Sequence, residues 1–368
     1  MEKDSRRDFL KKMGLAGFAM PMVSQFQNIK PSNKNAKKLG IALVGLGNYA
    51  TNRVGVGLEQ SNFWEVKGIV TGTPSKIPDW KKKWGIEDKN VFNYENFDKI
   101  SKSKDIDVVY ICLPNSMHRE FTERAAKAGK HVICEKPMAT SVEDARAMIK
   151  ACEENNVKLA IGYRLHFEPF NLEIMKFGRE KTFGDITFIN SDFGFKIGDP
   201  TQWRLNKKLA GGGPLMDVGI YSIQATRYTT GEEPVSVSAQ FGPVTDPSRF
   251  SEVEESVHYQ LDFPSGVTMS GFTSYKTNVQ RFNVACNDGW FELSPAFGYG
   301  PLKGKTSKGE MDLPIVQHQH AQMEGMGPLF MSDKPIPSHC SGEEGLKDMK
   351  ILMAILESAE NGGKKVML

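Results

Sequence analysis

Residues 39–50 read LGIALVGLGNYA, and this stretch decides the fold. Its first six residues form an apolar run of strand length, as expected for a parallel strand that is buried on both faces. In the GLGNYA turn that follows, Gly45 permits a tight turn, Gly47 lets the backbone approach a diphosphate, and Ala50 permits close packing of helix on strand. The first amides of the next helix would face the diphosphate. The stretch therefore predicts the start of a dinucleotide-binding domain.

Strands and helices alternate in the residues after this turn. Apolar runs predict further strands at 65–70, 107–113, 131–134 and 157–161, and periodic patterns predict helices at 119–128 and 141–155. The second of these helices starts with Ser141 and Asp144, which form a capping pair. Such alternation produces a parallel sheet with right-handed crossovers. We predict a doubly wound Rossmann domain over residues 39–162.

The pattern changes after Tyr163. Short turns rich in Gly, Pro and Asp separate strand-like segments, which lie at 185–195, 234–243, 254–263, 267–275, 279–286 and 290–293. Two helices are predicted, at 217–229 and 343–361. A run of strands with few helices indicates a largely antiparallel sheet. We therefore expect an α/β protein in which residues 163–368 form an α+β domain with an open sheet, used for substrate binding and oligomerisation.

The N-terminus differs from the rest of the chain. Residues 5–12 read SRRDFLKK and precede a modest apolar segment at 13–23. Paired arginines followed by a short apolar segment are typical of a twin-arginine export signal. We predict that residues 1–38 are a leader and a short arm and that the protein is periplasmic. The alternative is a basic amphipathic start to a cytoplasmic protein.

The composition argues against several other classes of protein. The chain has 47 basic and 44 acidic side chains, a net charge of +3, which gives no nucleic-acid footprint. No later stretch approaches the ~18 apolar residues of a membrane helix. The five cysteines match neither a disulfide framework nor a zinc spacing, so we expect mostly buried free thiols. His318 and His320 lack a third ligand, so we expect polar residues at a loop or helix start and no metal.

Two distant segments carry groups suited to hydride chemistry. Lys136 follows a strand in CEKP, and Asp217 and Tyr221 lie four residues apart on a predicted helix. Transfer of hydride from a hydroxyl carbon needs a base for the hydroxyl proton. Tyr221 could act as that base if Lys136 stabilises the phenolate. Asp217 could bind a substrate hydroxyl or hold Lys136. Taken singly, the three residues could equally be a surface lysine, a helix cap and a core aromatic.

The residues after the predicted strands bear on the choice of cofactor. Residues 71–76 read TGTPSK and offer hydroxyls and Lys76, where an NAD site normally has a carboxylate. This favours NADP over NAD, unless Lys76 only decorates a surface loop. Asn115 and His118 follow the strand at 107–113 and are placed to line the cofactor crevice, although His118 could equally cap a helix.

At these residues the chain resembles the glucose–fructose oxidoreductase and inositol dehydrogenase family, over nearly all of its length after the arm. The most specific segments are IGYRLHFEPFN at 161–171, WRLNKKLAGGGPLMDVGIY at 203–221 and TRYTTGEEP at 226–234, which are closest to the periplasmic glucose–fructose oxidoreductase branch. The resemblance implies that Lys136, Asp217 and Tyr221 are catalytic, Tyr221 replacing the histidine of many relatives. Together with Arg164 these residues would bind the substrate. The implied cofactor site comprises Gly45, Gly47, Asn48, Tyr49, Ala50, Thr71, Lys76, Leu113, Pro114, Asn115, His118, Glu135, Lys136, Arg164, Trp203 and Arg204.

Three functions follow from these patterns. The first is an NADP-dependent sugar oxidoreductase, working as a homodimer or homotetramer with a tightly bound cofactor. The second is a glycoside-cleaving relative that uses retained NAD, and the third is a non-catalytic sensor of sugars or nucleotides. The WRLN and DVGIY segments favour the first over the second, and the presence of Lys136, Asp217 and Tyr221 argues against the third.

Overall fold

The computed structural model describes residues 37–368. The predicted twin-arginine leader and nearly all of the predicted arm lie outside the described residues. Among residues 37–368 there is no helix with the length and apolar character needed to cross a bilayer.

The first part of the chain is a six-stranded sheet with strand order β3-β2-β1-β4-β5-β6. All neighbouring strands are parallel. The strands are β1 (Leu39–Val44), β2 (Trp64–Val70), β3 (Val91–Phe92), β4 (Val108–Ile111), β5 (His131–Cys134) and β6 (Leu159–Ile161). The strand order first runs outward from β1 to β3 and then continues from β4 on the other side of β1. In such folds ligands bind at the carboxyl ends of the strands where the order reverses, here between β1 and β4. The predicted Rossmann sheet is confirmed, with β3 as an addition.

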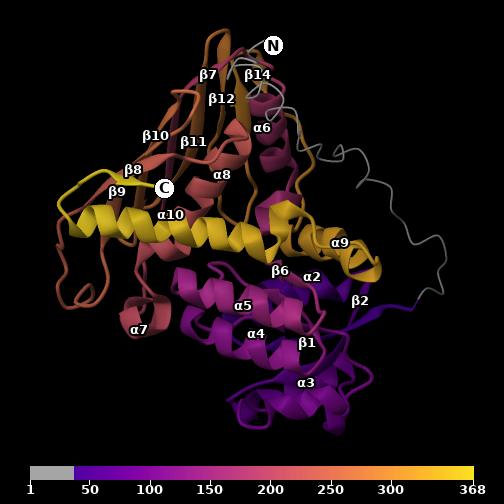
Figure 1. Cartoon of the computed structure of the whole chain (residues 1–368). Helices are drawn as coiled ribbons and strands as arrows, with labels where there is room; N and C mark the ends of the chain where they lie inside the picture. The colour runs from indigo at the N-terminus through magenta and orange to yellow at the C-terminus, as the bar shows by residue number, and fades with distance from the viewer. Residues whose placement is uncertain (1–36) are drawn as a thin grey trace, which may run out of the picture. The chain divides into compact units, whose positions relative to one another are not determined.

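Helices connect these strands. They are η2 (Ala50–Val54, a π-helical turn), α2 (Gly55–Glu59), α3 (Ile77–Trp84), α4 (His118–Lys127) and α5 (Val142–Glu154). The Ser141 side chain accepts a hydrogen bond of 3.0 Å from the amide of Asp144, so the predicted cap of α5 is confirmed. Figure 1 shows α4 and α5 side by side, packed in contact with each other.

The second part of the chain is a nine-stranded sheet with order β14-β13-β12-β11-β7-β10-β9-β8-β15. Its strands are β7 (Ile186–Gly194), β8 (Ser236–Phe241), β9 (Ser256–Asp262), β10 (Thr268–Ser274), β11 (Val279–Cys286), β12 (Gly289–Leu293), β13 (Gly304–Thr306), β14 (Gly309–Glu310) and β15 (Val366–Met367). The predicted, mostly antiparallel sheet is confirmed. Only the β7–β10 pair is parallel, because the long connection between these strands contains β8, β9 and several helices.

Three short or irregular elements precede the main helix of this part: η8 (Trp203–Leu205), α7 (Lys207–Ala210) and η9 (Leu215–Gly219). The main helix itself is α8 (Ile220–Thr230), which lies against the sheet together with α6 (Pro169–Arg179). The helix predicted at 217–229 therefore exists but starts earlier, as the π-helical turn η9.

Two C-terminal helices join the parts. Helix α10 (Gly342–Glu360) runs between α5 and β8 and contacts both (Figure 1). Helix α9 (His318–Met331) packs on α2 and accepts a 2.7 Å hydrogen bond from the Trp64 indole at the Met323 carbonyl. Helix α10 thus connects the Rossmann domain to the nine-stranded sheet, and α9 packs on the Rossmann domain.

Candidate active site

Lys136 brings the predicted catalytic residues together. It follows β5 at the carboxyl edge of the sheet, and its Nζ donates to the Asp217 carbonyl oxygen at 2.6 Å. The same Nζ lies 3.4 Å from Asp217 Oδ1 and 4.5 Å from the centroid of the Tyr221 ring. Only 11% of the Lys136 side chain is exposed. Lys136, Asp217 and Tyr221 therefore form one cluster, called the catalytic trio below.

Both carboxylate oxygens of Asp217 have protein partners. While Oδ1 faces Lys136, Oδ2 accepts hydrogen bonds from Arg204 Nε at 3.0 Å and from the Tyr275 hydroxyl at 3.1 Å. Burial works to raise the pKa of Asp217, but the charges of Arg204 and Lys136 hold that pKa below its ordinary value. Of the two roles considered for Asp217, holding Lys136 is the one for which the structure supplies the contacts.

Tyr221 has two cations next to its ring. The Arg164 guanidinium carbon is 4.8 Å from the Tyr221 ring centroid, on a buried side chain, and Lys136 is the second cation. Arg164 is fixed by the Phe297 carbonyl, to which it donates, and by His318 Nδ1 at 2.6 Å. Two cations thus lie against the ring of Tyr221.

The nucleotide turn leaves room for a diphosphate. Gly45 has φ +88°, and a Cβ at this position would lie 2.6 Å from the Cys112 carbonyl oxygen, so glycine is required here. A Cβ at Gly47 would meet nothing within 4 Å, so the space above the backbone is open. Ala50 is buried against the sheet. These features fit a dinucleotide at the turn.

A lysine and a hydroxyl lie beside the turn at the end of β2. The exposed Lys76 reaches back and donates from Nζ to the Leu46 carbonyl at 2.7 Å. Thr71 is buried, and its Oγ1 accepts from the amide of Thr73 at 3.0 Å. No carboxylate occurs in residues 71–76. This edge of the crevice is therefore suited to an anionic group.

The residues after β4 form hydrogen bonds to α7 and to the loop after β5. Asn115 Nδ2 donates to the Ala210 carbonyl at 2.8 Å and so links the Rossmann domain to α7. His118 is buried at the start of α4, where its ring nitrogens lie 2.9 Å from the Leu113 carbonyl oxygen and 3.0 Å from that of Pro137. Burial lowers the pKa of His118. Its ring thus connects the loops after β4 and β5.

Other predicted cofactor residues have protein partners of their own. The buried Glu135 accepts from the Tyr110 hydroxyl at 2.5 Å, and burial raises the pKa of this carboxyl. Tyr49 lies on the turn, and its hydroxyl is 3.5 Å from Gln319 Nε2 of α9. Trp203 is half-buried next to Arg204 at the start of η8. Pro114 precedes the short turn that leads into α4.

Tyr299 is a neighbour of the trio that was not predicted. Its ring lies 4.2 Å from the Arg53 guanidinium carbon and 4.4 Å from that of Arg164, and 44% of the residue is exposed. Tyr299 comes from the loop between β12 and β13, and Tyr275, which contacts Asp217, comes from the end of β10. The only sequence signal at Tyr299 is an aromatic residue in a loop rich in Gly and Pro.

The histidines of the QHQH segment have different partners. His318 starts α9 and contacts Arg164, whereas His320 Nδ1 lies 3.1 Å from the Gly57 carbonyl oxygen. Of the two alternatives predicted for them, a loop or a helix start, the structure shows the helix start. In the part of the chain that the structure describes, no group of three or more His, Cys, Asp or Glu residues has the geometry of a metal site. All five cysteines are free thiols, and Cys134, Cys152 and Cys340 are buried.

A family model described as an oxidoreductase family with an NAD-binding Rossmann fold matches residues 39–163, and the GFO/IDH/MocA C-terminal domain matches residues 172–292. The structure is similar to that of aldose–aldose oxidoreductase from Caulobacter crescentus complexed with glycerol. The two are 41% identical with a TM-score of 0.86, over 90% of this chain and 100% of that one. The chain belongs to the GFO/IDH/MocA oxidoreductase family.

Other members of the GFO/IDH/MocA family are similar at lower identity. D-Xylose 1-dehydrogenase [NADP(+)] from Haloarcula marismortui is 27% identical over 330 residues, which is 87% of this chain and 90% of the relative. 1,5-Anhydro-D-fructose reductase from Ensifer adhaerens is 27% identical over 70% of this chain and 79% of the relative. The predicted family is confirmed, and the protein is an NAD(P)-dependent oxidoreductase of CH–OH groups.

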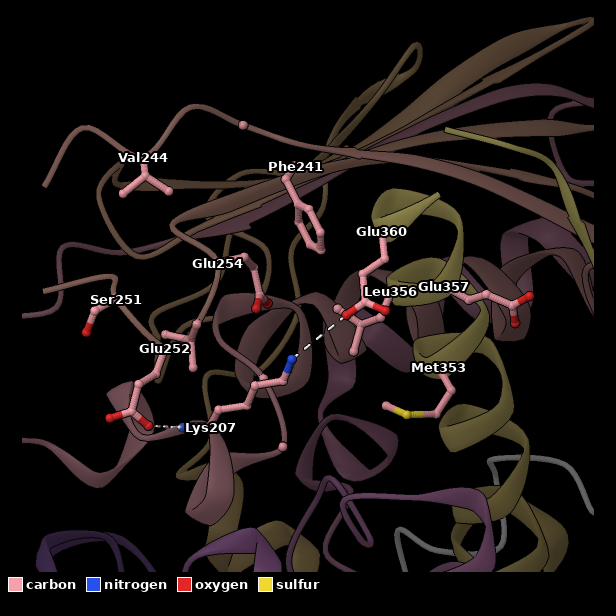
Figure 2. Close-up of a pocket in the computed structure, with 14 residues that line it drawn as sticks. Lys207, Phe241, Val244, Ser251, Glu252, Glu254, Met353, Leu356, Glu357 and Glu360 are labelled. Atoms are coloured by element: carbon pink, nitrogen blue, oxygen red, sulfur yellow. Dashed lines mark hydrogen bonds and ion pairs between the residues drawn. The ribbon is translucent and has the colours of Figure 1, made fainter. Parts of the chain in front are cut away.

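This GFO/IDH/MocA protein also has a cavity of about 480 Å³ away from the trio (Figure 2). Gly211 and Gly212 line it together with residues of α7, the end of β8 and α10. Lys207 Nζ is 3.8 Å from Glu360 Oε1, and the Lys207 amide donates to Glu252 at 3.1 Å. No trio residue lines this cavity.

Proposed function

We propose that this protein is an NADP-dependent sugar oxidoreductase that transfers hydride to or from a CH–OH group and keeps its cofactor bound between turnovers. The observation that carries the proposal is the convergence of Lys136, Asp217 and Tyr221 beside the nucleotide turn. Similarity to an aldose–aldose oxidoreductase and to an NADP-linked xylose dehydrogenase supports a sugar substrate.

Each member of the trio has a separate task in this proposal. When bound, NADP would supply or accept the hydride. Tyr221 takes the hydroxyl proton during oxidation and returns it during reduction. Burial works to lower the pKa of Lys136, but Tyr221 and Asp217 raise it above its ordinary value, so Lys136 stays charged and stabilises the phenolate. Asp217, fixed by Arg204 and Tyr275, holds Lys136 in place.

The NADP preference rests on the end of β2. Lys76 and Thr71 follow β2, beside the nucleotide turn, and residues 71–76 contain no carboxylate of the kind that binds the ribose 2′-hydroxyl in an NAD site. A charged ammonium favours a 2′-phosphate, so NADP is preferred over NAD in this proposal.

We also propose that the protein is periplasmic and exported by its twin-arginine-like leader, as in the glucose–fructose oxidoreductase branch. Twin-arginine export carries folded proteins, so the enzyme would acquire its cofactor before it leaves the cytoplasm. A retained cofactor suits a compartment with little free nucleotide. Hydride would then pass from one sugar to another on the same NADP molecule.

A homo-oligomer is part of this proposal. The face of the nine-stranded sheet opposite α6 and α8 presents Phe188, 41% exposed, and the half-buried Phe272. His258 packs beside Phe272 with ring centroids 4.6 Å apart. No helix among residues 37–368 covers this face, so a second copy of the chain is the occupant we propose.

The test is mass spectrometry of the nucleotide released when purified, dialysed protein is denatured. Stoichiometric NADP, with hydride exchange between sugar pairs in the absence of added nucleotide, is the expected result. Empty protein that needs added nucleotide would contradict cofactor retention. Retained NAD would contradict the NADP preference and favour a glycoside-cleaving reaction.

A further inference from the structure

Helix α10 carries a buried carboxylate outside the site described above. Asp348 is 1% exposed. Its Oδ2 accepts hydrogen bonds from the Tyr163 hydroxyl and from Gln224 Nε2, both at 2.6 Å. Its Oδ1 accepts from Arg227 Nη1 at 2.7 Å. One carboxylate thus joins α10 to α8 and to the segment that follows β6.

Each of these two segments contains a residue of the catalytic trio or a residue in contact with it. Tyr163 immediately precedes Arg164, whose guanidinium lies on the Tyr221 ring. Gln224 lies three residues after Tyr221 on α8, which places the two side chains on neighbouring parts of one helix face. A shift of Asp348 would therefore move both Tyr221 and the cation beside it.

Arg227 has carboxylate partners other than Asp348, unlike Tyr163 and Gln224. It also donates two hydrogen bonds to Glu233, at 2.6 and 2.7 Å, and lies 2.5 Å from Glu344 Oε1. Within residues 37–368, the Tyr163 hydroxyl and the Gln224 amide group donate only to Asp348. Removal of the Asp348 charge would thus leave Arg227 paired but would release the two segments that lead to the site.

Burial of this carboxylate is costly. Burial raises the pKa of Asp348 to about 7, even though Arg227 works to lower it. An apolar side chain could fill the same space without that cost, because buried polar groups stabilise a fold less than well-packed apolar ones. The hydrogen bonds to Tyr163 and Gln224 give the carboxylate a directional role that an apolar side chain lacks.

We propose that Asp348 is a positioning residue of the oxidoreductase reaction, which holds Tyr221 and Arg164 in register with Lys136 through Gln224 and Tyr163. This inference rests on the role proposed for Tyr221. It adds to the site a residue on α10, the helix that also packs against the Rossmann domain.

The first test compares Asp348→Asn with Glu344→Gln as a matched control. Both variants remove one carboxylate from Arg227, but only the first disturbs Tyr163 and Gln224. We expect Asp348→Asn to lower kcat about 10- to 100-fold, as misplacement of a reacting group does. The Kd of NADP should stay unchanged, and Glu344→Gln should keep the kcat of the wild type. Wild-type kcat in Asp348→Asn, or an equal loss of kcat in both variants, would overturn the inference.

Tyr163→Phe provides a second route if Asp348→Asn does not fold. It removes one of the two links without changing charge, so kcat should fall while NADP affinity is kept. The double variant should lose no more than the more affected single variant, because both changes break the same connection. Full additivity, or wild-type kcat in Tyr163→Phe, would contradict the proposed connection.

Crystal structures of Asp348→Asn and Tyr163→Phe separate this inference from the proposed function. We expect the Tyr221 ring to move away from Lys136 Nζ in both variants. An unchanged trio would overturn the positioning role whatever the substrate is. Absence of sugar turnover in the wild type would instead refute the proposed function and leave the structural comparison to decide on Asp348.

Discussion

Lys136 has three interactions that a surface lysine would not have. It contacts the carbonyl and the carboxylate of Asp217 and lies over the Tyr221 ring. Because these partners raise the pKa of Lys136, the proposed mechanism uses Lys136 as a fixed cation and assigns proton transfer to Tyr221. The different roles proposed for the site residues predict different effects of single substitutions.

Tyr221→Phe removes the phenol and keeps the ring. We expect turnover to fall about 10²- to 10⁴-fold, the usual contribution of a positioned acid or base. Cofactor binding should be kept, because the nucleotide turn is untouched. Steady-state kinetics and NADPH fluorescence check the two halves of this prediction, and full activity in the variant would show that another residue moves the proton.

Lys76→Ala should weaken NADP more than NAD. A charge-assisted hydrogen bond to a phosphate contributes about 1.5–3 kcal/mol, so we expect about a 10- to 100-fold loss of NADP affinity. Titration calorimetry with both cofactors measures the difference. Lys67→Ala is the control, since Lys67 lies on β2, the strand that precedes the turn with Lys76, and pairs with Glu65. An equal loss for NADP and NAD in Lys76→Ala would refute the 2′-phosphate argument.

At the scale of elements, the predictable parts are those with local signals. Helix α5 has a cap and a periodic face, and the trio lies in motifs that follow a strand or start a helix. Helix α9 was not predicted, because Gly325, Gly327 and Pro328 lower its intrinsic helix propensity. Tyr275 and Tyr299 were missed because only the tertiary fold brings them to the trio.

Packing against α2 explains why α9 exists, and this contact can be tested. A Cβ at Gly57 would lie 2.8 Å from backbone atoms of Gln319 and His320. We expect Gly57→Ala to cost about 1–3 kcal/mol of unfolding free energy, because overpacking forces the two helices apart. Urea denaturation measures the change. Gly198→Ala is the control, since a Cβ there meets nothing within 4 Å; equal stability of both variants would contradict the close contact.

At the scale of the whole molecule, a buried histidine links stability to pH. Burial, followed by the charges of His339 and Arg227, lowers the pKa of His166 well below its ordinary value of about 6.5. Its contribution to stability is therefore present above about pH 6.5 and is lost as the pH falls below that value.

Comparison with His166→Gln isolates this contribution. Between pH 7.5 and pH 5.5 the wild type should lose more unfolding free energy than the variant, by roughly 1.4 kcal/mol per pH unit below 6.5. Urea denaturation at both pH values measures the two losses. Parallel losses in the two proteins would mean that His166 is protonated in the native state.

Assembly through the open sheet face predicts a specific change in mass. Phe272→Arg places a charge at the centre of that face and should shift the oligomer toward monomer in sedimentation equilibrium. Ile315→Arg adds the same charge at an apolar residue, 71% exposed, outside the strands of the sheet, and should leave the mass unchanged. An unaltered mass in Phe272→Arg would place the contact elsewhere.

The late position of helix α10 in the sequence determines when the two domains can complete their packing during synthesis. The ribosome synthesises it after all strands of the Rossmann sheet and after every strand of the second sheet except β15. The surfaces of α5, β6 and β8 that it contacts therefore stay exposed to water on the nascent chain until α10 emerges. We expect neither domain to reach its native packing during elongation, so both would mature together at the end of translation.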